Sequence, residues 1–178
     1  SVKERLVFGA LAALAVALAA AEVPEVNRLF EDGSFEPSER VNVGFAIAMR
    51  GGGVVAPAIL DTTHKNLDET MAAIKDLVRR VRRGKLKSSE MTESTITVTS
   101  LGDLGVDTVY GVIYPPQVAI VGIGSPRETA IAHDGMVGVR TCVDVTLSGD
   151  HRVSDGLVGA RFLQLVEGYL QDPESLKE

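Results

Sequence analysis

The residues best suited to acid–base chemistry in this chain lie close together near its carboxyl end. His151 and Asp155 are four positions apart, and Asp150 directly precedes the histidine. Histidine exchanges a proton near neutral pH, and a nearby carboxylate can fix its tautomer and support its positive form. This chemistry predicts a general base at His151, although the spacing alone favours an ordinary solvated turn.

The sequence on either side predicts the elements that hold this turn. Residues 138–147 alternate between apolar and polar side chains, which is typical of a half-buried strand. Residues 157–170 are apolar at helical spacing, and Ser154 or Asp155 can cap the start of that helix. A carboxylate at a helix N-terminus is favoured as an anion. We therefore expect His151 in a turn between a strand and a helix.

A metal site formed by Asp150, His151 and Asp155 is a weaker interpretation. Two carboxylates and one histidine make no closed zinc set, and no second histidine and cysteine pair occurs elsewhere in the sequence. We therefore expect no metal at these residues.

The remaining histidines and the single cysteine have poorer settings for catalysis. His133 falls in a hairpin turn signal at residues 132–135, and His64 falls in a predicted loop. We expect both to be exposed and inert. Cys142 lies inside the predicted strand, where a small buried hydrophobe is the better interpretation than a nucleophile.

Length and composition predict a single globular domain. The chain has 178 residues, of which 45% are hydrophobic and 24% are charged, values that are ordinary for a soluble domain with a proper core. A net charge of −6 and the lack of tryptophan argue against general nucleic-acid binding. One cysteine excludes an internal disulfide framework.

An apolar run at residues 6–21 has two interpretations. Lys3 and Arg5 precede it and Ala19, Ala20 and Ala21 end it, as in a signal peptide. The run is mostly alanine, however, which is only mildly hydrophobic and the best helix former. We prefer a small-residue helix buried in the core, and we expect no membrane association.

Several other segments carry clear structural patterns. Residues 41–49 and 54–60 read as two strands, and the glycines between them predict a plain turn because no helix follows that could bind a phosphate. Residues 67–83 predict a helix capped by Asn66 or Asp68, with a basic run at its end. We interpret this run as a solvated face, and attraction of an anionic partner is the alternative. Residues 95–101 and 118–123 predict two more strands.

The residues Asp150-His151-Arg152, followed by Asp155-Gly156, resemble the active-site motif of the dihydrolipoamide acyltransferases. These are core components of 2-oxo-acid dehydrogenase complexes and relatives of chloramphenicol acetyltransferase. Further segments that resemble this family are residues 23–27, 56–61, 84–86, 97–102 and 114–120. The chain departs from the family pattern at Met49-Arg50, where Thr-Pro is usual, and at Thr99 and Ser100, where Ser-Asn is usual.

The resemblance implies an α/β fold, a two-layer sandwich in which helices flank a mixed β-sheet, as in chloramphenicol acetyltransferase. It implies acyl transfer from S-acyl-dihydrolipoyl lysine to coenzyme A. His151 would be the general base, Thr99 would stabilise the oxyanion, and Asp155 would orient the loop. The family's site lies between subunits of a homotrimer, and the trimers build a larger core, so we expect His151 and Thr99 to meet only across an interface.

The resemblance also implies partners and a location. The lipoyl group would be carried on a separate lipoyl domain, and the core would bind the decarboxylase and dihydrolipoamide dehydrogenase components. The protein would lie in the bacterial cytoplasm, or in the mitochondrial matrix of a eukaryote. Residues 1–178 would form one catalytic domain that lacks the family's opening strand and helix, with no lipoyl or subunit-binding domain.

Three alternatives stay open at this stage. One is an enzyme like chloramphenicol acetyltransferase, with a small acyl acceptor. Another is a non-catalytic structural core, which would assemble without turnover. A secreted or membrane-anchored protein is the third, and cleavage after Ala21 would support it.

Overall fold

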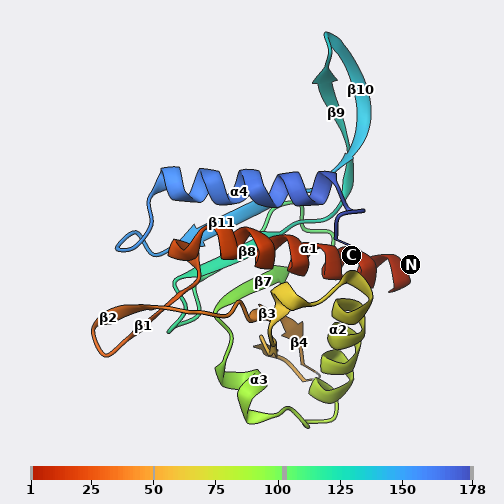
Figure 1. Ribbon diagram of the computed structural model, residues 1–178. Helices are drawn as coiled ribbons and strands as arrows, with labels where there is room; N and C mark the ends of the chain where they lie inside the picture. Colours follow the sequence, from red (N-terminus) through yellow and green to blue (C-terminus); the bar gives the residue numbers. More distant parts are fainter. Residues whose placement is uncertain (1, 50, 102–103, 177–178) are drawn as a thin grey trace.

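The computed structural model describes residues 2–49, 51–101 and 104–176, and its centre is a five-stranded mixed sheet (Figure 1). The strand order is β11-β8-β7-β3-β6. The two central pairs, β3 with β7 and β7 with β8, are parallel, and the outer pairs are antiparallel. The strands are β3 (Val43–Phe45), β6 (Ala58–Ile59), β7 (Ile96–Ser100), β8 (Ala119–Ile123) and β11 (Val145–Gly149).

Three helices cover one face of this sheet (Figure 1). They are α1 (Val2–Glu22), α2 (Leu67–Val81) and α4 (Gly156–Gln171), and α1 contacts both of the others as well as β3 and β7. The helices and the inward residues of the strands, such as Val98 and Val121, form one hydrophobic core. This two-layer arrangement of helices on a mixed sheet confirms the predicted fold class.

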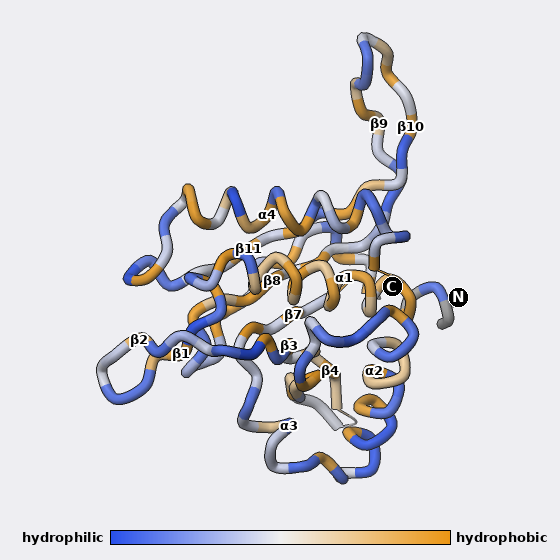
Figure 2. The backbone as a smooth tube through the Cα atoms, in the orientation of Figure 1, coloured by the Kyte–Doolittle hydropathy of each residue, from blue (hydrophilic) through white to orange (hydrophobic). Residues whose placement is uncertain are grey.

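The alanine-rich helix α1 is the centre of that core. Ala13, Ala15 and Ala17 have no accessible surface. Figure 2 shows α1 hydrophobic over most of its length, whereas α4 alternates between hydrophobic and hydrophilic residues. Small side chains let α1 pack closely against the sheet and its two neighbouring helices. The predicted buried helix is confirmed, and across the described residues no helix combines the length and hydropathy needed to cross a membrane.

Two helix starts were predicted correctly from their capping residues. Asn66 caps α2 by accepting a hydrogen bond from the backbone N–H of Glu69, whose carboxylate in turn accepts from the backbone N–H of Asn66. Asp155 caps α4. These side chains satisfy backbone donors that have no partner within the first turn of a helix.

The strand predicted at residues 138–147 is wrong as a single element. Residues 136–142 form β10 (Met136–Cys142), which pairs with β9 (Arg127–His133) in a hairpin that projects from the body (Figure 1). Residues 145–149 form β11 in the main sheet. The break falls at Asp144, whose carboxylate accepts hydrogen bonds from Arg127 and Thr108. Side-chain partners at Asp144 turn the chain from one sheet to the other.

The hairpin predicted at residues 41–60 is confirmed, but it is divided into two pairs. β3 pairs with β6, and β4 (Ile47–Ala48) pairs with β5 (Val54–Val55) in a separate two-stranded sheet. The division falls at Ala46, whose N–H donates to the carbonyl of Val98 in β7. Gly51, Gly52 and Gly53 all have positive φ, so the predicted plain turn is also confirmed. Arg50 lies outside the described residues.

Five short elements were not predicted. The first two are β1 (Arg28–Glu31) and β2 (Ser34–Pro37), which pair across a turn at Asp32 and Gly33. The others are α3 (Ser88–Thr92) and the 3₁₀ turns at Pro24–Val26 and Thr62–His64. All are too short for a periodic pattern to distinguish them from loops.

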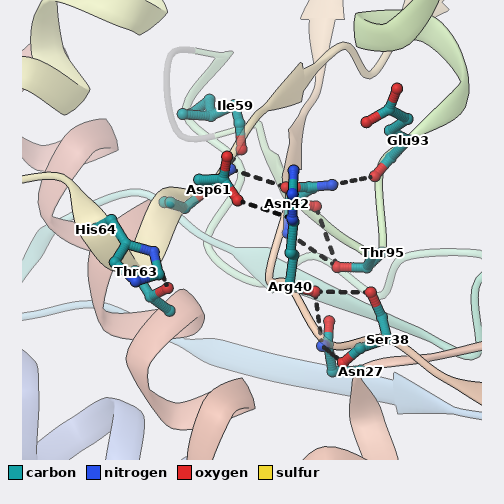
Figure 3. Close-up of polar contacts among 11 residues, drawn as sticks. Asn27, Ser38, Arg40, Asn42, Ile59, Asp61, Thr63, His64, Glu93 and Thr95 are labelled. Carbon is teal, nitrogen blue, oxygen red and sulfur yellow. Dashed lines mark hydrogen bonds and ion pairs between the residues drawn. The ribbon is translucent and has the colours of Figure 1, made fainter.

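The buried side chain of Asn42 ties three loops to the start of β3 (Figure 3). Its amide donates to the carbonyl of Glu93 at 2.9 Å, and its side-chain oxygen accepts from the N–H of Asp61 at 2.8 Å. Its backbone N–H donates to Thr95 Oγ1 at 3.0 Å. These bonds satisfy polar groups that would otherwise be costly to bury.

On the second face of the sheet, strand β8 is covered by an extended segment, residues 106–111. A Cβ atom on Gly122 would collide with the carbonyl oxygen of Val109, and one on Gly124 would collide with that of Asp107. Thr146 of β11 donates a hydrogen bond to the same Val109 carbonyl. The glycines therefore allow this segment to lie directly on β8.

Candidate active site

The turn that carries His151 is organised around Asp150. The N–H of Asp150 donates to the carbonyl of Val118 at 2.8 Å, which joins the turn to the start of β8. The carbonyl of Asp150 accepts from the N–H groups of Val153 and Ser154, both at 3.1 Å, and from the Ser154 hydroxyl at 3.2 Å. Most of the polar groups of the turn are thereby fixed close to the end of β11.

The side chain of His151 is exposed at this fixed turn. Its ring makes no hydrogen bond with any of the described residues. It lines a hollow of about 260 Å³ together with residues 152–155 and Val158. An imidazole that is held by a rigid backbone but has no partner of its own can accept a proton from a bound molecule.

Asp155 serves as the N-cap of α4. Its Oδ1 accepts from the N–H groups of Leu157 at 2.9 Å and Val158 at 3.0 Å. The hydrogen bond from Val158 lowers the pKa of the Asp155 carboxyl below its ordinary value, and the bond from Leu157 and the nearby charge of His151 act in the same direction. Asp155 therefore fixes the end of the turn rather than hydrogen-bonding to the imidazole.

Arg152 makes contacts that the sequence did not predict. Its guanidinium binds the Asp150 carboxylate through Nε at 3.0 Å and Nη2 at 2.6 Å, and these bonds lower the pKa of Asp150. The Arg152 Cζ atom lies 4.3 Å from the ring centroid of Phe30 and 5.1 Å from that of Phe35. No spacing rule connects a turn at residue 152 with a hairpin at residue 30.

Thr99 lies on the second face of the sheet, next to the covering segment. It pairs with Gly122 of β8, which in turn pairs with Thr146 of β11. Thr95 and Thr97 share this face, and their hydroxyls bond to Asn42 and Gln117 respectively. Thr99 is half-buried, and its hydroxyl has no hydrogen-bond partner among the described residues.

The structure does not bring Thr99 and His151 together within one chain. Thr99 lies level with Gly122, whereas the turn of His151 is bonded to Val118 at the other end of β8. Four residues of strand separate these levels, a distance of about 13 Å at roughly 3.3 Å per residue. Strand β8 also lies between β7 and β11. The two side chains cannot act on one atom in a single chain.

The other candidate residues lie away from this turn. His133 is exposed at the tip of the β9–β10 hairpin, with Nε2 at 3.3 Å from Asp134, and His64 is exposed beside Thr63 (Figure 3). The predicted exposure of both is confirmed. Cys142 ends β10 and is half-buried rather than fully buried, because the hairpin leaves the body of the protein.

The basic run at the end of α2 is partly structural. Arg80 binds the carboxylates of Asp76 and Glu90, and Arg79 also binds Asp76. Both partners hold the pKa of Arg80 above its ordinary value, Glu90 having the larger effect. The exposed Arg82, Arg83, Lys85 and Lys87 fit the predicted solvated face.

Comparison with known proteins gives a consistent result. Residues 1–177 match the family model of the 2-oxoacid dehydrogenases acyltransferase catalytic domain. A dihydrolipoyllysine-residue acetyltransferase component of the pyruvate dehydrogenase complex from Rickettsia bellii is 36% identical over 160 residues, which are 90% of this chain and 38% of the relative. A mitochondrial component from Arabidopsis thaliana is 32% identical, covering 97% of this chain and 32% of the relative. The chain thus spans about two fifths or less of these relatives.

Solved structures show the same similarity. A probable dihydrolipoamide acetyltransferase from Listeria monocytogenes has a TM-score of 0.87 and 32% identity, over 92% of this chain and 69% of that one. The Azotobacter vinelandii dihydrolipoamide acetyltransferase has a TM-score of 0.87 and 28% identity, over 94% and 69% of the two chains. That structure was used to investigate a serine, a histidine and an asparagine in the catalytic mechanism.

A more distant neighbour supports the fold alone. A chloramphenicol acetyltransferase has a TM-score of 0.61 at 17% identity, over 90% of this chain and 76% of that one. The predicted fold type is therefore confirmed. Together with the match over residues 1–177, these relatives show that the chain belongs to the family of 2-oxoacid dehydrogenase acyltransferase catalytic domains.

Proposed function

We propose that this chain transfers an acyl group from S-acyl-dihydrolipoyl lysine to coenzyme A, with His151 as the general base. The observation that carries the proposal is the exposed imidazole of His151, held on a rigid turn in the Asp-His-Arg motif of a family of acyltransferases. The relatives named above are acetyltransferase components, so acetyl is the favoured acyl group and a branched-chain acyl group is the alternative.

The reaction requires one proton to move twice. His151 takes the proton from the coenzyme A thiol, and the thiolate sulfur forms a bond to the carbonyl carbon of the thioester. The carbonyl oxygen becomes an oxyanion, to which the Thr99 hydroxyl donates a hydrogen bond. The bond from carbon to the dihydrolipoyl sulfur then breaks, and His151 returns the proton to that sulfur. No residue of the chain forms a covalent bond to the acyl group.

The spacing in the Azotobacter protein supports these residue roles. Its serine precedes its histidine by the same number of positions as Thr99 precedes His151, and its asparagine follows at the same spacing as Asp155. Threonine keeps the hydroxyl donor of serine, and aspartate keeps the cap acceptor of asparagine. The chemistry of each position is thus retained although two residue types differ.

The separation of Thr99 and His151 supports a site between two copies of the chain. We propose a homotrimer in which His151 of one copy faces Thr99 of the next, with the trimers assembling into a larger core. A solved structure similar to this chain, with 28% identity and a TM-score of 0.86, is the cubic core of a pyruvate dehydrogenase complex.

The substrates and partners follow from this function. Coenzyme A is one substrate, and a lipoyl group on a separate lipoyl domain is the other. The decarboxylase and dihydrolipoamide dehydrogenase components would be further partners. The similar proteins include bacterial and mitochondrial components, so we propose a bacterial cytoplasmic or a mitochondrial matrix location.

The direct test is acyl transfer between coenzyme A and dihydrolipoamide by full-length protein, using acetyl, isobutyryl and succinyl donors. His151→Ala should lower kcat by about 10²–10⁴, the usual contribution of a positioned base, without lowering Tm because the ring makes no hydrogen bond to the described residues. Equal transfer rates for wild type and variant would remove His151 as the base, and no transfer by either protein would favour a non-catalytic structural core. Acetylation of chloramphenicol without transfer to dihydrolipoamide would favour the small-acceptor enzyme.

A further inference from the structure

We propose that Phe30 and Phe35 are positioning residues for His151, on which they act through Arg152. The two rings project from the β1–β2 hairpin, far from the motif in sequence, and neither is part of the Asp-His-Arg motif. The inference rests on the proposed role of His151 as a base. It assigns a function to a hairpin that the transfer mechanism does not otherwise use.

The contact between Arg152 and the two rings is close. The Phe30 and Phe35 centroids are 4.7 Å apart with a tilt of 40°, and the guanidinium carbon lies 4.3 Å from one and 5.1 Å from the other. A cation within about 6 Å of a ring centroid is attracted by the ring quadrupole. Arginine suits this position because its planar group can stack on a ring while its N–H groups bind elsewhere.

The guanidinium also binds Asp150 in two-pronged geometry. Nε lies 3.0 Å from Oδ1 and Nη2 lies 2.6 Å from Oδ2, and the backbone N–H of Arg152 also donates to Oδ1 at 3.0 Å. The Arg152 side chain is 60% exposed, so the ion pair alone contributes little. Contact with two rings together with two side-chain hydrogen bonds leaves the guanidinium few alternative positions.

These contacts converge on the two residues that flank His151. The carbonyl of Asp150 accepts hydrogen bonds from the N–H groups of Val153 and Ser154, and the N–H of Asp150 donates to the carbonyl of Val118. The His151 ring makes no hydrogen bond within the part of the chain that the structure describes, so its direction is set by Asp150 and Arg152 on either side. Movement of Arg152 away from its contacts would release one of these two supports.

The hairpin itself is anchored beside the same point of the sheet. The N–H of Phe30 donates to the carbonyl of Pro116 at 2.7 Å, and Leu29 forms a bridge with Gln117. These residues directly precede Val118, to which Asp150 is bonded. The hairpin and the turn are therefore fixed to one short segment, which allows the rings to hold Arg152 in a defined place.

The test compares full-length Phe30→Leu, Phe35→Leu and the double variant with wild type. Leucine keeps the apolar character and removes the ring. We expect each single variant to lower kcat by about 3- to 10-fold with KM unchanged, as loss of a cation–π contact permits. Phe30→Tyr keeps the ring and should restore the wild-type rate. Ser34→Ala is the matched control, because Ser34 binds Glu36 in the same hairpin and does not contact Arg152.

Hydrogen exchange followed by mass spectrometry gives a readout that is independent of activity. The peptide that covers residues 148–158 should exchange faster in the leucine variants, while peptides from α1 and β8 keep wild-type protection. A variant that is destabilised throughout would lose protection in all of these peptides. If the leucine variants do not fold, Arg152→Lys provides the second test, because it keeps both rings and the charge but removes the two-pronged fork.

Unchanged kcat and unchanged exchange at residues 148–158 in the double variant would overturn the proposal. So would a fall in kcat accompanied by loss of protection in every peptide. Equal transfer by wild type and His151→Ala would instead contradict the proposed function. In that case the exchange data would still decide whether the two rings order the turn.

Discussion

Thr99 and His151 lie at opposite ends of the same sheet, with β8 between the strands that carry them. Thr99 pairs with Gly122 near one end of β8, whereas the turn of His151 is hydrogen-bonded to Val118 at the other end. Each residue has a polar group with no hydrogen-bond partner among the described residues: a hydroxyl at Thr99 and an imidazole at His151. In the proposed function, one chain therefore supplies two separate halves of a site, and a second copy supplies the missing half at each end.

Substitution of Thr99 tests the oxyanion donor. Thr99→Val keeps the side-chain shape and removes the hydroxyl, so kcat should fall by about 10²–10³. Thr99→Ser keeps the hydroxyl donor and should keep most of the activity. Steady-state kinetics measure both, with thermal unfolding as the control. A Thr99→Val enzyme with the wild-type kcat would remove Thr99 from the mechanism.

Substitution of Asp155 separates its role as a cap from its charge. Asp155→Asn keeps an acceptor for the N–H groups of Leu157 and Val158 and should keep most activity. Asp155→Ala removes the cap and should lower Tm by about 2–4 °C and reduce kcat.

The pH dependence follows from the lowered pKa of Asp155. Because the folded-state pKa is depressed, the charged cap stabilises α4 above the ordinary Asp range, and that stability is lost as pH falls through the lowered value. The acid limb of Tm against pH should therefore be shallower in Asp155→Asn. Identical acid limbs for the two proteins would contradict a stabilising charge at this cap.

The sequence predicted most of the fold because long periodic segments and capping residues are local signals. The helices at α1, α2 and α4 and the strands β7 and β8 were found in this way. The strands at residues 41–49 and 138–147 were each divided, at Ala46 and Asp144, by hydrogen bonds to residues distant in sequence. Such contacts do not change the local alternation of apolar and polar residues, so this pattern cannot reveal them.

The same limit applies to the candidate site. His151, Asp155 and Thr99 could be named from a motif and its neighbouring segments, because each has a fixed place in the sequence pattern. The stacking of Arg152 on Phe30 and Phe35 joins segments more than a hundred residues apart. Only the folded hairpin places those rings over the turn.

The ion pair of Glu90 with Arg80 is expected to stabilise the connection from α2 to α3. Both side chains are largely buried, with 8% and 20% of their surfaces exposed. Glu90→Gln should lower the free energy of unfolding by about 1.5–3 kcal/mol at pH 7, the range for hydrogen bonds to charged groups. Urea denaturation measures this change, and the exposed Glu93→Gln is a matched control.

The sign of the pH effect at Glu90 is fixed by Arg80, which lowers the pKa of the Glu90 carboxyl. The stabilisation is present above the ordinary Glu range and is lost as pH falls through the lowered pKa. The unfolding free energies of wild type and Glu90→Gln should therefore converge in acid. A difference that stays constant with pH would show that the charge of Glu90 is not responsible.

Gly122 is expected to be intolerant of a side chain, because a Cβ there meets the backbone of Val109. Gly122→Ala should lower the free energy of unfolding by about 2–3 kcal/mol through overpacking. It should also lower activity, since Gly122 pairs with Thr99.

Gly159→Ala in α4 is the control: the nearest atom to its Cβ, Leu147 Cδ2, is at an ordinary 3.5 Å. It should stabilise the protein by about 0.5–1 kcal/mol. Equal stability for both variants would contradict close packing of residues 106–111 on β8.

Subunit complementation tests the central claim, that His151 and Thr99 meet only between chains. His151→Ala and Thr99→Val proteins, each inactive alone, would be co-expressed and purified as mixed assemblies. Random mixing in cyclic trimers restores about a quarter of the sites, because the Thr99→Val chain supplies His151 and the His151→Ala chain supplies Thr99. We predict about a quarter of the wild-type kcat per chain. Mixed assemblies as inactive as their parents would contradict a shared site.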